Sequence, residues 1–432
     1  MRFNPASAPD YDPTLPIPRV DDALTNAMPG YGIIHAYMAW VVGTTHAPPL
    51  YHLGAILPGL AYEVARRGIQ VGGRLPRVWT CLVGGSAGGK STAHECAQDF
   101  IRDWERAILG PAYTDPYLHL DGSMPGVLAA SSAYYRDQAG ATVCVYETDE
   151  MTKILSQLDS VAETLCKIFD GRTIVRQLRQ FQVAKEAGEK VNDTVRTPAI
   201  SASFATVPAS LERVAQGYHL EGGLFSRVLW FRGKLKPEEL QPRRFPRTAA
   251  RTAALAEWQG WTGWLDGVAA LGPVVVQIPA TVYQLFDDEL FGQWRERLVN
   301  DGDRVNSARL RAIPYAETLA GLFALSRGSL LVDDDDAVRA INLVEQCIVT
   351  LQGLDETVAV DVQAKLRARV LETVRKSGPC IKKTIYQATG VSKGDLDLAL
   401  ATLEESGLIE KVPRSPGVNG RPPEQYRIPK VC

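Results

Sequence analysis

The chain alternates between short, continuous apolar runs and longer segments with helical spacing of apolar residues. The apolar runs are Val78–Val83, Thr142–Tyr146, Ala199–Phe204 and Val228–Phe231. Runs of this length, bounded by glycine or polar residues, are typical of strands buried on both faces of a parallel sheet. Because they alternate with helical segments, we predict an α/β fold built around a parallel sheet.

Helical patterning lies before and after these runs. Gly30–Gly43 and Pro49–Arg67 are predicted to form two apolar helices that precede the first strand as an N-terminal helical cap. Beyond a break rich in Pro and Arg, further helices are predicted at Thr252–Val268, Thr281–Asn300, Arg309–Ser326 and Ala337–Leu351. Four carboxylates, Asp333–Asp336, precede the last of these, and we interpret them as a capping cluster rather than a metal site.

A glycine-rich loop joins the first predicted strand to a helix expected from Ser91 to Leu109. Its sequence, Gly84-Gly-Ser-Ala-Gly-Gly-Lys-Ser, fits the pattern G-x-x-x-x-G-K-[ST]. Glycines let the backbone approach phosphates closely, so that its N–H groups and the helix N-terminus bind them. We therefore expect ATP here, with Lys90 on the β- and γ-phosphates and Ser91 on Mg²⁺. The predicted nucleotide-binding residues are Gly84, Gly85, Ser86, Ala87, Gly88, Gly89, Lys90, Ser91 and Thr92.

Acidic residues end the second apolar run, in the segment Val143–Met151. P-loop enzymes that hydrolyse ATP need one acid that supports Mg²⁺ and one that orients the attacking water. Asp149 and Glu150 are the preferred pair, with Asp149 as the metal ligand. Glu147 is the alternative, because it is the first acid after the apolar run.

The order of these motifs resembles the ATPase core of helicases related to the minichromosome-maintenance (MCM) AAA+ proteins. It is even more similar to the helicases and primase–helicases of phages and mobile elements. The resemblance covers about Pro29–Asp361 and rests on the P-loop together with Pro49–His52, Leu165–Gly171, Ala205–Pro208 and Gly223–Arg227. It implies an AAA+/ASCE-type P-loop ATPase with a helical lid, assembled into a hexamer that moves along DNA.

The resemblance also implies roles for single residues. Thr206 stands nearest to the polar residue that senses the γ-phosphate in that family. Arg227, in Phe225-Ser-Arg-Val, matches an arginine that enters the ATP site of the neighbouring subunit and stabilises the transition state. Arg309 and Arg311 are both candidates for a second sensor in the lid, and the pattern does not choose between them.

A basic insertion lies between Gly171 and Pro198. Its segments Thr173–Val183 and Val191–Thr197 are predicted to be the arms of a β-hairpin. In the proteins that the chain resembles, a hairpin at this place projects lysines toward the DNA backbone, which makes Lys185 and Lys190 candidate DNA contacts. A solvated surface hairpin is the alternative.

The C-terminal segment Lys365–Lys430 is predicted to be a winged helix with a local excess of basic residues. Leu366–Lys376 and Lys382–Ala388 form its first two helices, and Ser392 is the N-cap of the third. Wing strands are expected at Leu408–Val412 and Gln425–Ile428. Candidate DNA contacts are Lys393, Lys411, Arg414 and Arg421, and a protein-binding module is the alternative.

The amino-acid composition excludes some classes of protein. Lys and Arg total 47 and Asp and Glu total 49, so the net charge of −2 excludes a uniformly basic nucleic-acid binder but permits local basic regions. No two of the seven cysteines form a CxxC pair. This favours reduced thiols in a cytoplasmic protein. A membrane-spanning helix needs about 20 residues, and no apolar stretch of the sequence is that long. We expect a cytoplasmic protein without a membrane partner.

Four regions follow from these patterns. Residues 1–75 are expected to form an N-terminal arm and helical cap, 76–236 a P-loop ATPase core with the basic hairpin, 237–360 a helical lid, and 361–432 the winged helix. The favoured function is an ATP-dependent DNA motor, namely a hexameric replicative helicase of a phage or mobile element. It would act on single-stranded or forked DNA with a replication initiator or primase.

Two other functions remain open from sequence. One is an ATP-switched DNA-binding regulator or helicase loader that does not unwind DNA. The other is a P-loop kinase for a small molecule, which the acidic pair and the C-terminal winged helix disfavour.

Overall fold

The computed structural model describes residues 26–86, 88–120, 123–152, 159–177, 192–214, 223–233, 248–292, 303–412 and 425–429. The chain divides into two compact units, Met1–Gln352 and Gly353–Cys432. Helix α15 (Asp334–Ser377) supplies residues to both of them. None of the described helices combines the length and apolar character that a bilayer-spanning segment needs.

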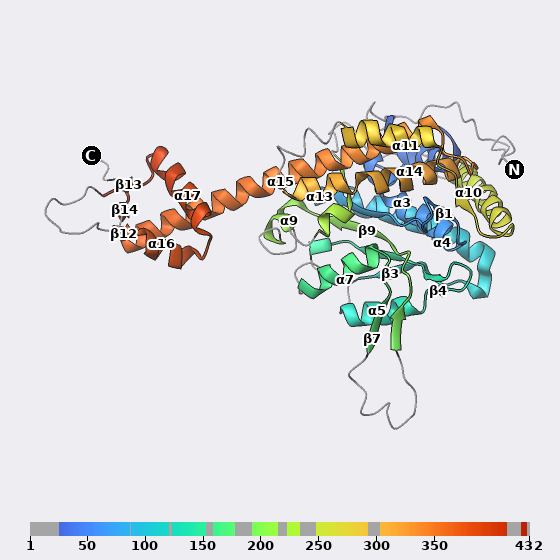
Figure 1. Ribbon diagram of the computed structural model, residues 1–432, viewed down its shortest axis with the longest axis horizontal. Helices are drawn as coiled ribbons and strands as arrows, with labels where there is room; N and C mark the ends of the chain where they lie inside the picture. The colour runs from blue at the N-terminus through green and yellow to red at the C-terminus, as the bar shows by residue number, and fades with distance from the viewer. Residues whose placement is uncertain are drawn as a thin grey trace, which may run out of the picture. The chain divides into compact units, whose positions relative to one another are not determined.

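The larger unit is built around a five-stranded parallel sheet, of which β3 and β9 are labelled in Figure 1. The strand order is β10-β2-β9-β6-β3. Every residue of β2, β6 and β9 is buried, which explains the continuous apolar runs in the sequence. This confirms the predicted α/β class. The five strands are β2 (Trp79–Val83), β3 (Tyr117–His119), β6 (Val145–Thr148), β9 (Ser201–Thr206) and β10 (Leu229–Arg232).

Helices pack around this sheet. The predicted N-terminal helices are present as α2 (Gly32–Thr44) and α3 (Pro49–Ala65), and α3 packs on β2, β9 and β10. The P-loop helix is also present, as α4 (Lys90–Leu109). Other helices among the described residues of this unit, besides α15, are α5 (Met124–Ser132), α7 (Asp159–Phe169), α9 (Pro208–Val214), α10 (Thr248–Ala269), α11 (Ala280–Phe286), α13 (Asp303–Leu310) and α14 (Ala312–Ser326).

Two predicted helices are interrupted. The segment Arg309–Ser326 is divided at Arg311 into α13 and α14. Pro314 explains the break, because proline has no N–H to donate to the carbonyl four residues earlier and is tolerated only in the first turn of a helix. In the helix expected from Thr281 to Asn300, α11 ends at Phe286 and a π-helical turn, Asp287–Gly292, follows, while residues 293–300 lie outside the described residues.

The capping interpretation of the acidic run is confirmed. The Asp336 N–H donates to Asp333 Oδ1 at 3.0 Å, and the Asp333 N–H donates to Asp336 Oδ2 at 3.2 Å. Arg327 also pairs with both carboxylates. These contacts cap the start of α15.

Short strand pairs complete the larger unit. β7 (Ile174–Gln177) and β8 (Asn192–Val195) run antiparallel, with Ile174 opposite Val195, and they form the base of the predicted hairpin. The hairpin tip, with Lys185 and Lys190, lies outside the described residues. The other pairs are β1 (Gln70–Val71) with β11 (Val275–Val276) and β4 (Tyr135–Arg136) with β5 (Ala141–Thr142).

The smaller unit consists of short helices and a small antiparallel sheet. The end of α15 is followed by β12 (Cys380–Ile381), α16 (Lys382–Thr389), α17 (Lys393–Glu405), β13 (Glu410–Lys411) and β14 (Gln425–Arg427). The sheet order is β12-β14-β13. The predicted break between two helices at 351–366 is wrong, because α15 is continuous there.

Helix α17 begins as predicted. The Ser392 hydroxyl accepts a hydrogen bond from the Asp395 N–H at 3.2 Å, so Ser392 is its N-cap. Leu396, Leu400 and Leu403 are buried in the core of this unit, whereas Leu398 is 57% exposed. Lys393 is exposed at the start of α17, and Arg414 and Arg421 lie outside the described residues.

Candidate active site

The loop between β2 and α4 is tightly curved, and this backbone geometry suits an anion. Gly89 has a φ of +85°, and a Cβ at this position would lie 2.8 Å from Ala47 Cα. The Gly88 N–H donates to Gly85 O at 3.2 Å, which curls the loop. Glycine is therefore required at Gly89 both by its left-handed conformation and by the close approach of the N-terminal helices.

Lys90 lies at the centre of this loop. Its Nζ donates to Gly84 O at 2.6 Å and to Gly85 O at 2.8 Å. Burial lowers the pKa of Lys90, and the negative charge of Glu150 opposes that shift. The ammonium group is thus held by loop carbonyls that a phosphate would replace. Ser91 and Thr92 follow in the first turn of α4, and Ala87 lies outside the described residues.

Tyr51 of α3 holds the backbone next to the loop through its hydroxyl group. The sequence analysis did not predict this role. Its hydroxyl donates to Val83 O at 2.6 Å, and Gly233 O lies 3.2 Å away. A Cβ on Gly84 would lie only 2.0 Å from this hydroxyl. Tyr51 belongs to the segment Pro49–His52, so the N-terminal helices position the P-loop through a buried hydrogen bond.

We expect Tyr51→Phe to lower the free energy of unfolding by about 1 kcal/mol, because the Val83 carbonyl loses a buried donor. The affinity for ATP should fall by a few fold for the same reason. Urea unfolding and ATP titration measure both effects. The exposed Tyr283 provides the matched control, and Tyr283→Phe should change neither quantity. Equal results for the two variants would contradict a supporting role for Tyr51.

Glu150 and Thr206 meet beside the P-loop. Glu150 Oε1 accepts a hydrogen bond from Thr206 Oγ1 at 3.1 Å and another from the Thr152 hydroxyl. Thr206, the last residue of β9, pairs in register with Val83, the last residue of the P-loop strand. The Gly84 N–H donates to Thr206 O at 3.3 Å. Strand β9 therefore connects the acid to the phosphate loop.

Glu147 has different partners. It is buried in β6, where its carboxylate lies 3.3 Å from His119 Nδ1 of β3 and 3.9 Å from an Arg102 nitrogen of α4. Burial raises the pKa of Glu147, and the interactions with His119, Gln98 and Arg102 oppose that shift. Because its neighbours are on β3 and α4 rather than on the loop, the geometry favours Glu150 as the acid nearest the phosphates.

Asp149 and Ser91 offer oxygen atoms at the same edge of the sheet. Asp149 is 77% exposed, and its Oδ1 lies 3.8 Å from Nδ1 of the buried His94. His94 is in turn 3.1 Å from Ser203 Oγ through Nε2. Mg²⁺ prefers oxygen ligands and retains several waters beside nucleotide phosphates, so an exposed carboxylate and the exposed Ser91 hydroxyl fit this ion.

Among the described residues, no group of three or more His, Cys, Asp and Glu side chains is arranged to hold a metal ion by itself.

Arg227 lies at the amino ends of the parallel strands, whereas the P-loop lies at their carboxyl ends. In the pairing of β10 with β2, Leu229 is opposite Thr80, so Arg227 lies level with Val78. At about 3.3 Å per residue, the six residues from Val78 to Gly84 span roughly 20 Å. Arg227 is therefore too far away to complete the site of its own chain.

The Arg227 side chain is engaged by its own chain. Its Nε and one terminal nitrogen donate to the two oxygens of Asp170, at 3.0 and 2.9 Å, and its other terminal nitrogen donates to Gly223 O. Burial alone would raise the pKa of Asp170, but the Arg227 pair lowers it below its ordinary value. Asp170 lies in the segment Leu165–Gly171 on which the resemblance rests, but the sequence analysis assigned it no role.

The two candidate sensor arginines lie close to Arg227. Arg309 is buried at the end of α13, the helix that packs against the turn Phe225–Arg227. Arg311 lies 3.8 Å from Asp170 and is partly exposed. Both are thus grouped with Arg227, and the structure does not bring them to their own P-loop.

Comparison with known proteins adds no assignment to this geometry. The chain matches no protein-family model and no curated protein sequence.

Proposed function

We propose that the protein is an ATPase that couples hydrolysis to movement on DNA. The observation that carries this proposal is the group formed by Lys90, Thr206 and Glu150, which joins a P-loop to a hydrogen-bonded acid across neighbouring parallel strands. A cation for the phosphates and an acid beside them are what ATP hydrolysis by P-loop enzymes needs.

The residues have distinct roles in this proposal. The loop N–H groups and Lys90 bind and orient the β- and γ-phosphates. Ser91 and Asp149 would hold Mg²⁺, which would neutralise negative charge on the phosphates. Glu150 orients the attacking water and accepts its proton. Thr206 donates a hydrogen bond to Glu150 and senses the γ-phosphate.

The proposal extends to assembly and to DNA. Arg227, at the edge of the sheet away from its own P-loop, would complete the site of a neighbouring copy in a ring, as in the AAA+ proteins that the sequence resembles. The candidate DNA-binding elements are the hairpin that β7 and β8 begin, through Lys185 and Lys190, and the helix-turn-helix of the smaller unit, with exposed Lys393. We propose that this smaller unit is a winged helix, and that the activity is that of a replicative helicase.

A pair of matched variants tests the assignment of the catalytic acid. Glu150→Gln should retain ATP binding but slow hydrolysis by a factor on the order of 10² or more, because the amide cannot accept the proton. Glu147→Gln should hydrolyse ATP within a few fold of the unmodified chain. Equilibrium ATP binding and steady-state phosphate release measure the two quantities. The reverse result would assign the role to Glu147.

Strand separation of a forked DNA tests the motor itself. The unmodified chain should separate the strands only with ATP and Mg²⁺, and Glu150→Gln should not. ATP hydrolysis without strand separation would instead favour the ATP-switched regulator.

A further inference from the structure

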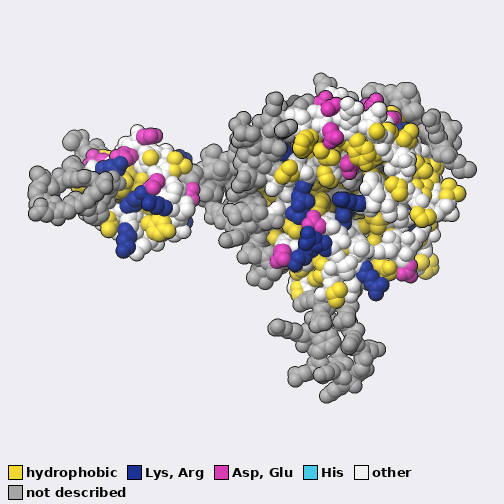
Figure 2. Space-filling model, in the orientation of Figure 1, with side chains coloured by type: hydrophobic (Ala, Val, Ile, Leu, Met, Phe, Trp, Pro, Cys, Tyr) yellow, Lys and Arg dark blue, Asp and Glu magenta, His cyan; other side chains and the backbone are white. Residues whose placement is uncertain are grey.

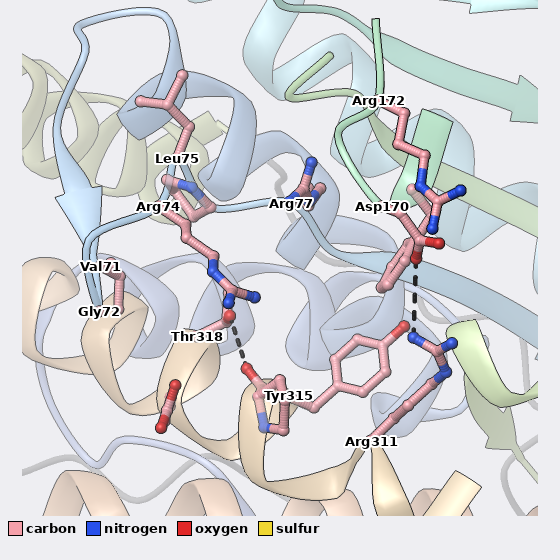
Figure 3. A pocket seen from close by; sticks show the side chains of 14 residues that line it. Val71, Gly72, Arg74, Leu75, Arg77, Asp170, Arg172, Arg311, Tyr315 and Thr318 are labelled. Carbon is pink, nitrogen blue, oxygen red and sulfur yellow. Dashed lines mark hydrogen bonds and ion pairs between the residues drawn. The ribbon is translucent and has the colours of Figure 1, made fainter. Parts of the chain in front are cut away.

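A cavity of about 320 Å³ opens at the edge of the sheet opposite to the P-loop. Three separate parts of the larger unit form it: the turn between β1 and β2, the end of α7 and the start of α14. Figure 3 shows Arg74 and Arg77 on one side of this space, Asp170, Arg172 and Arg311 on the other, and Tyr315 between them. We call it the arginine pocket.

The arginine pocket has an excess of positive charge. Its lining includes the guanidinium groups of Arg74, Arg77, Arg172 and Arg311, against the carboxylates of Asp170 and Glu317. Asp170 is already paired with Arg227, which adds a further positive charge behind the wall. Figure 2 shows Lys and Arg side chains gathered on one face of the larger unit, with few acidic side chains between them.

Among the described residues, Arg74, Arg77 and Arg172 form no ion pair with a carboxylate at 4.0 Å or less, and Asp170 pairs instead with Arg227 and Arg311. Arg77 is half-buried and donates to the Pro198 carbonyl at 2.8 Å. Burial and the nearby charge of Arg74 lower the pKa of Arg77. Packing like charges together costs free energy, which an anion bound between them would offset.

Two backbone features also suit an anion. Gly171 has a φ of +74°, and a Cβ there would lie 2.4 Å from an Arg77 nitrogen, so this glycine makes room for the guanidinium group. Helix α14 begins at Ala312 with Arg311 as its N-cap and without a side-chain capping bond. The dipole at its N-terminus favours negative charge at this place.

The pocket also has apolar and aromatic surface. Phe169 and Tyr315 line it, with ring centroids 5.8 Å apart, together with Leu75 and Pro76. Cavities of roughly 300 Å³ and above that combine such surface with a few charged groups typically hold small molecules. A purely inorganic anion would leave this apolar surface unused.

We propose that the arginine pocket binds a phosphorylated small molecule of nucleotide size, with its phosphates on Arg74, Arg77 and Arg172 and its apolar part against Phe169 and Tyr315. A pocket with two carboxylates in its wall fits a compact ligand better than the continuous backbone of a nucleic acid, because those carboxylates would repel further phosphates. The site is separate from the P-loop and does not depend on the proposed ATPase activity.

The test uses the full-length chain with Lys90→Ala, which weakens phosphate binding at the P-loop. Calorimetric titration with ATP and, separately, with inorganic pyrophosphate should show one saturable site per chain, with ATP bound more tightly because its base contacts the aromatic surface. Adding Arg74→Gln or Arg77→Gln should weaken binding of both probes about tenfold. Arg106→Gln, at an exposed arginine of α4, should leave binding unchanged.

The variants are chosen so that loss of folding does not decide the result. Arg74 is exposed, so Arg74→Gln should unfold at the same urea concentration as its parent, whereas Arg77 also bonds to the Pro198 carbonyl. Equal affinities of the pocket variants and the Arg106→Gln control would overturn the proposal. So would a loss that affects only binding of a single-stranded oligonucleotide, since this would make the surface a nucleic-acid contact.

Discussion

Lys90→Ala is expected to abolish ATP hydrolysis, with a loss on the order of 10³-fold, while the larger unit stays folded. Lys90 Nζ bonds to two carbonyls of the loop, at Gly84 and Gly85, so its removal takes away both the cation for the phosphates and the contacts that shape the loop. Loss of a single preorganised donor in an active site typically costs 10²–10³-fold in rate. Steady-state phosphate release and equilibrium ATP binding should both decrease.

The matched control is Lys167→Ala. Lys167 is an exposed lysine of α7 that pairs only with Glu163 on the same helix among the described residues, and its removal should leave turnover unchanged. Circular dichroism and thermal unfolding check that Lys90→Ala retains its fold. Near-native turnover in a folded Lys90→Ala protein would reject the assignment of the P-loop.

Mixing two inactive variants is expected to restore activity. Arg227→Ala keeps an intact P-loop, and Lys90→Ala keeps an intact Arg227. Because Arg227 lies roughly 20 Å along the sheet from its own P-loop, it would act only on a neighbouring copy. An interface between the two variants then pairs both intact groups. The ATPase rate should rise with mixing ratio, reach a maximum at intermediate ratios and fall again as either variant dominates.

Each variant alone should be slowed by on the order of 10³-fold or more, the usual contribution of an arginine finger. Subunit exchange is first verified with labelled chains, since unmixed assemblies cannot form the interface. As a control, Arg227→Ala mixed with Glu150→Gln should also regain activity, because Glu150 and Lys90 serve the same site. A rate that stays at the level of the single variants across all ratios would rule out action of Arg227 in trans.

The strands of the fold were predictable because they are buried on both faces. Trp79–Val83 and Ser201–Thr206 are fully buried, and both lie within or next to continuous apolar runs. β3 was not predictable, since it has three residues and ends in the exposed His119. The order of the strands was also inaccessible, because pairing of β9 between β2 and β6 is decided by packing between distant segments.

The candidate site was predictable where one segment carries it and not where distant segments meet. The P-loop lies within eight consecutive residues, so its spacing is visible in the sequence. The contact of Arg227 with Asp170 joins positions 57 residues apart, and no local pattern reports it. Likewise, the choice between Glu147 and Glu150 depends on which neighbours each carboxylate has, namely His119 or Thr206.

The placement of the P-loop and Arg227 at opposite edges of one sheet restricts the symmetry of an assembly. In a twofold dimer, both copies contribute the same surface to the interface. A compact interface of this kind would not contain both the P-loop and Arg227 of each chain. Copies that complete each other's sites would have to associate head to tail. An open row of such copies would have one P-loop and one Arg227 unused at its ends. Closure into a ring would therefore add one complete site without adding a subunit.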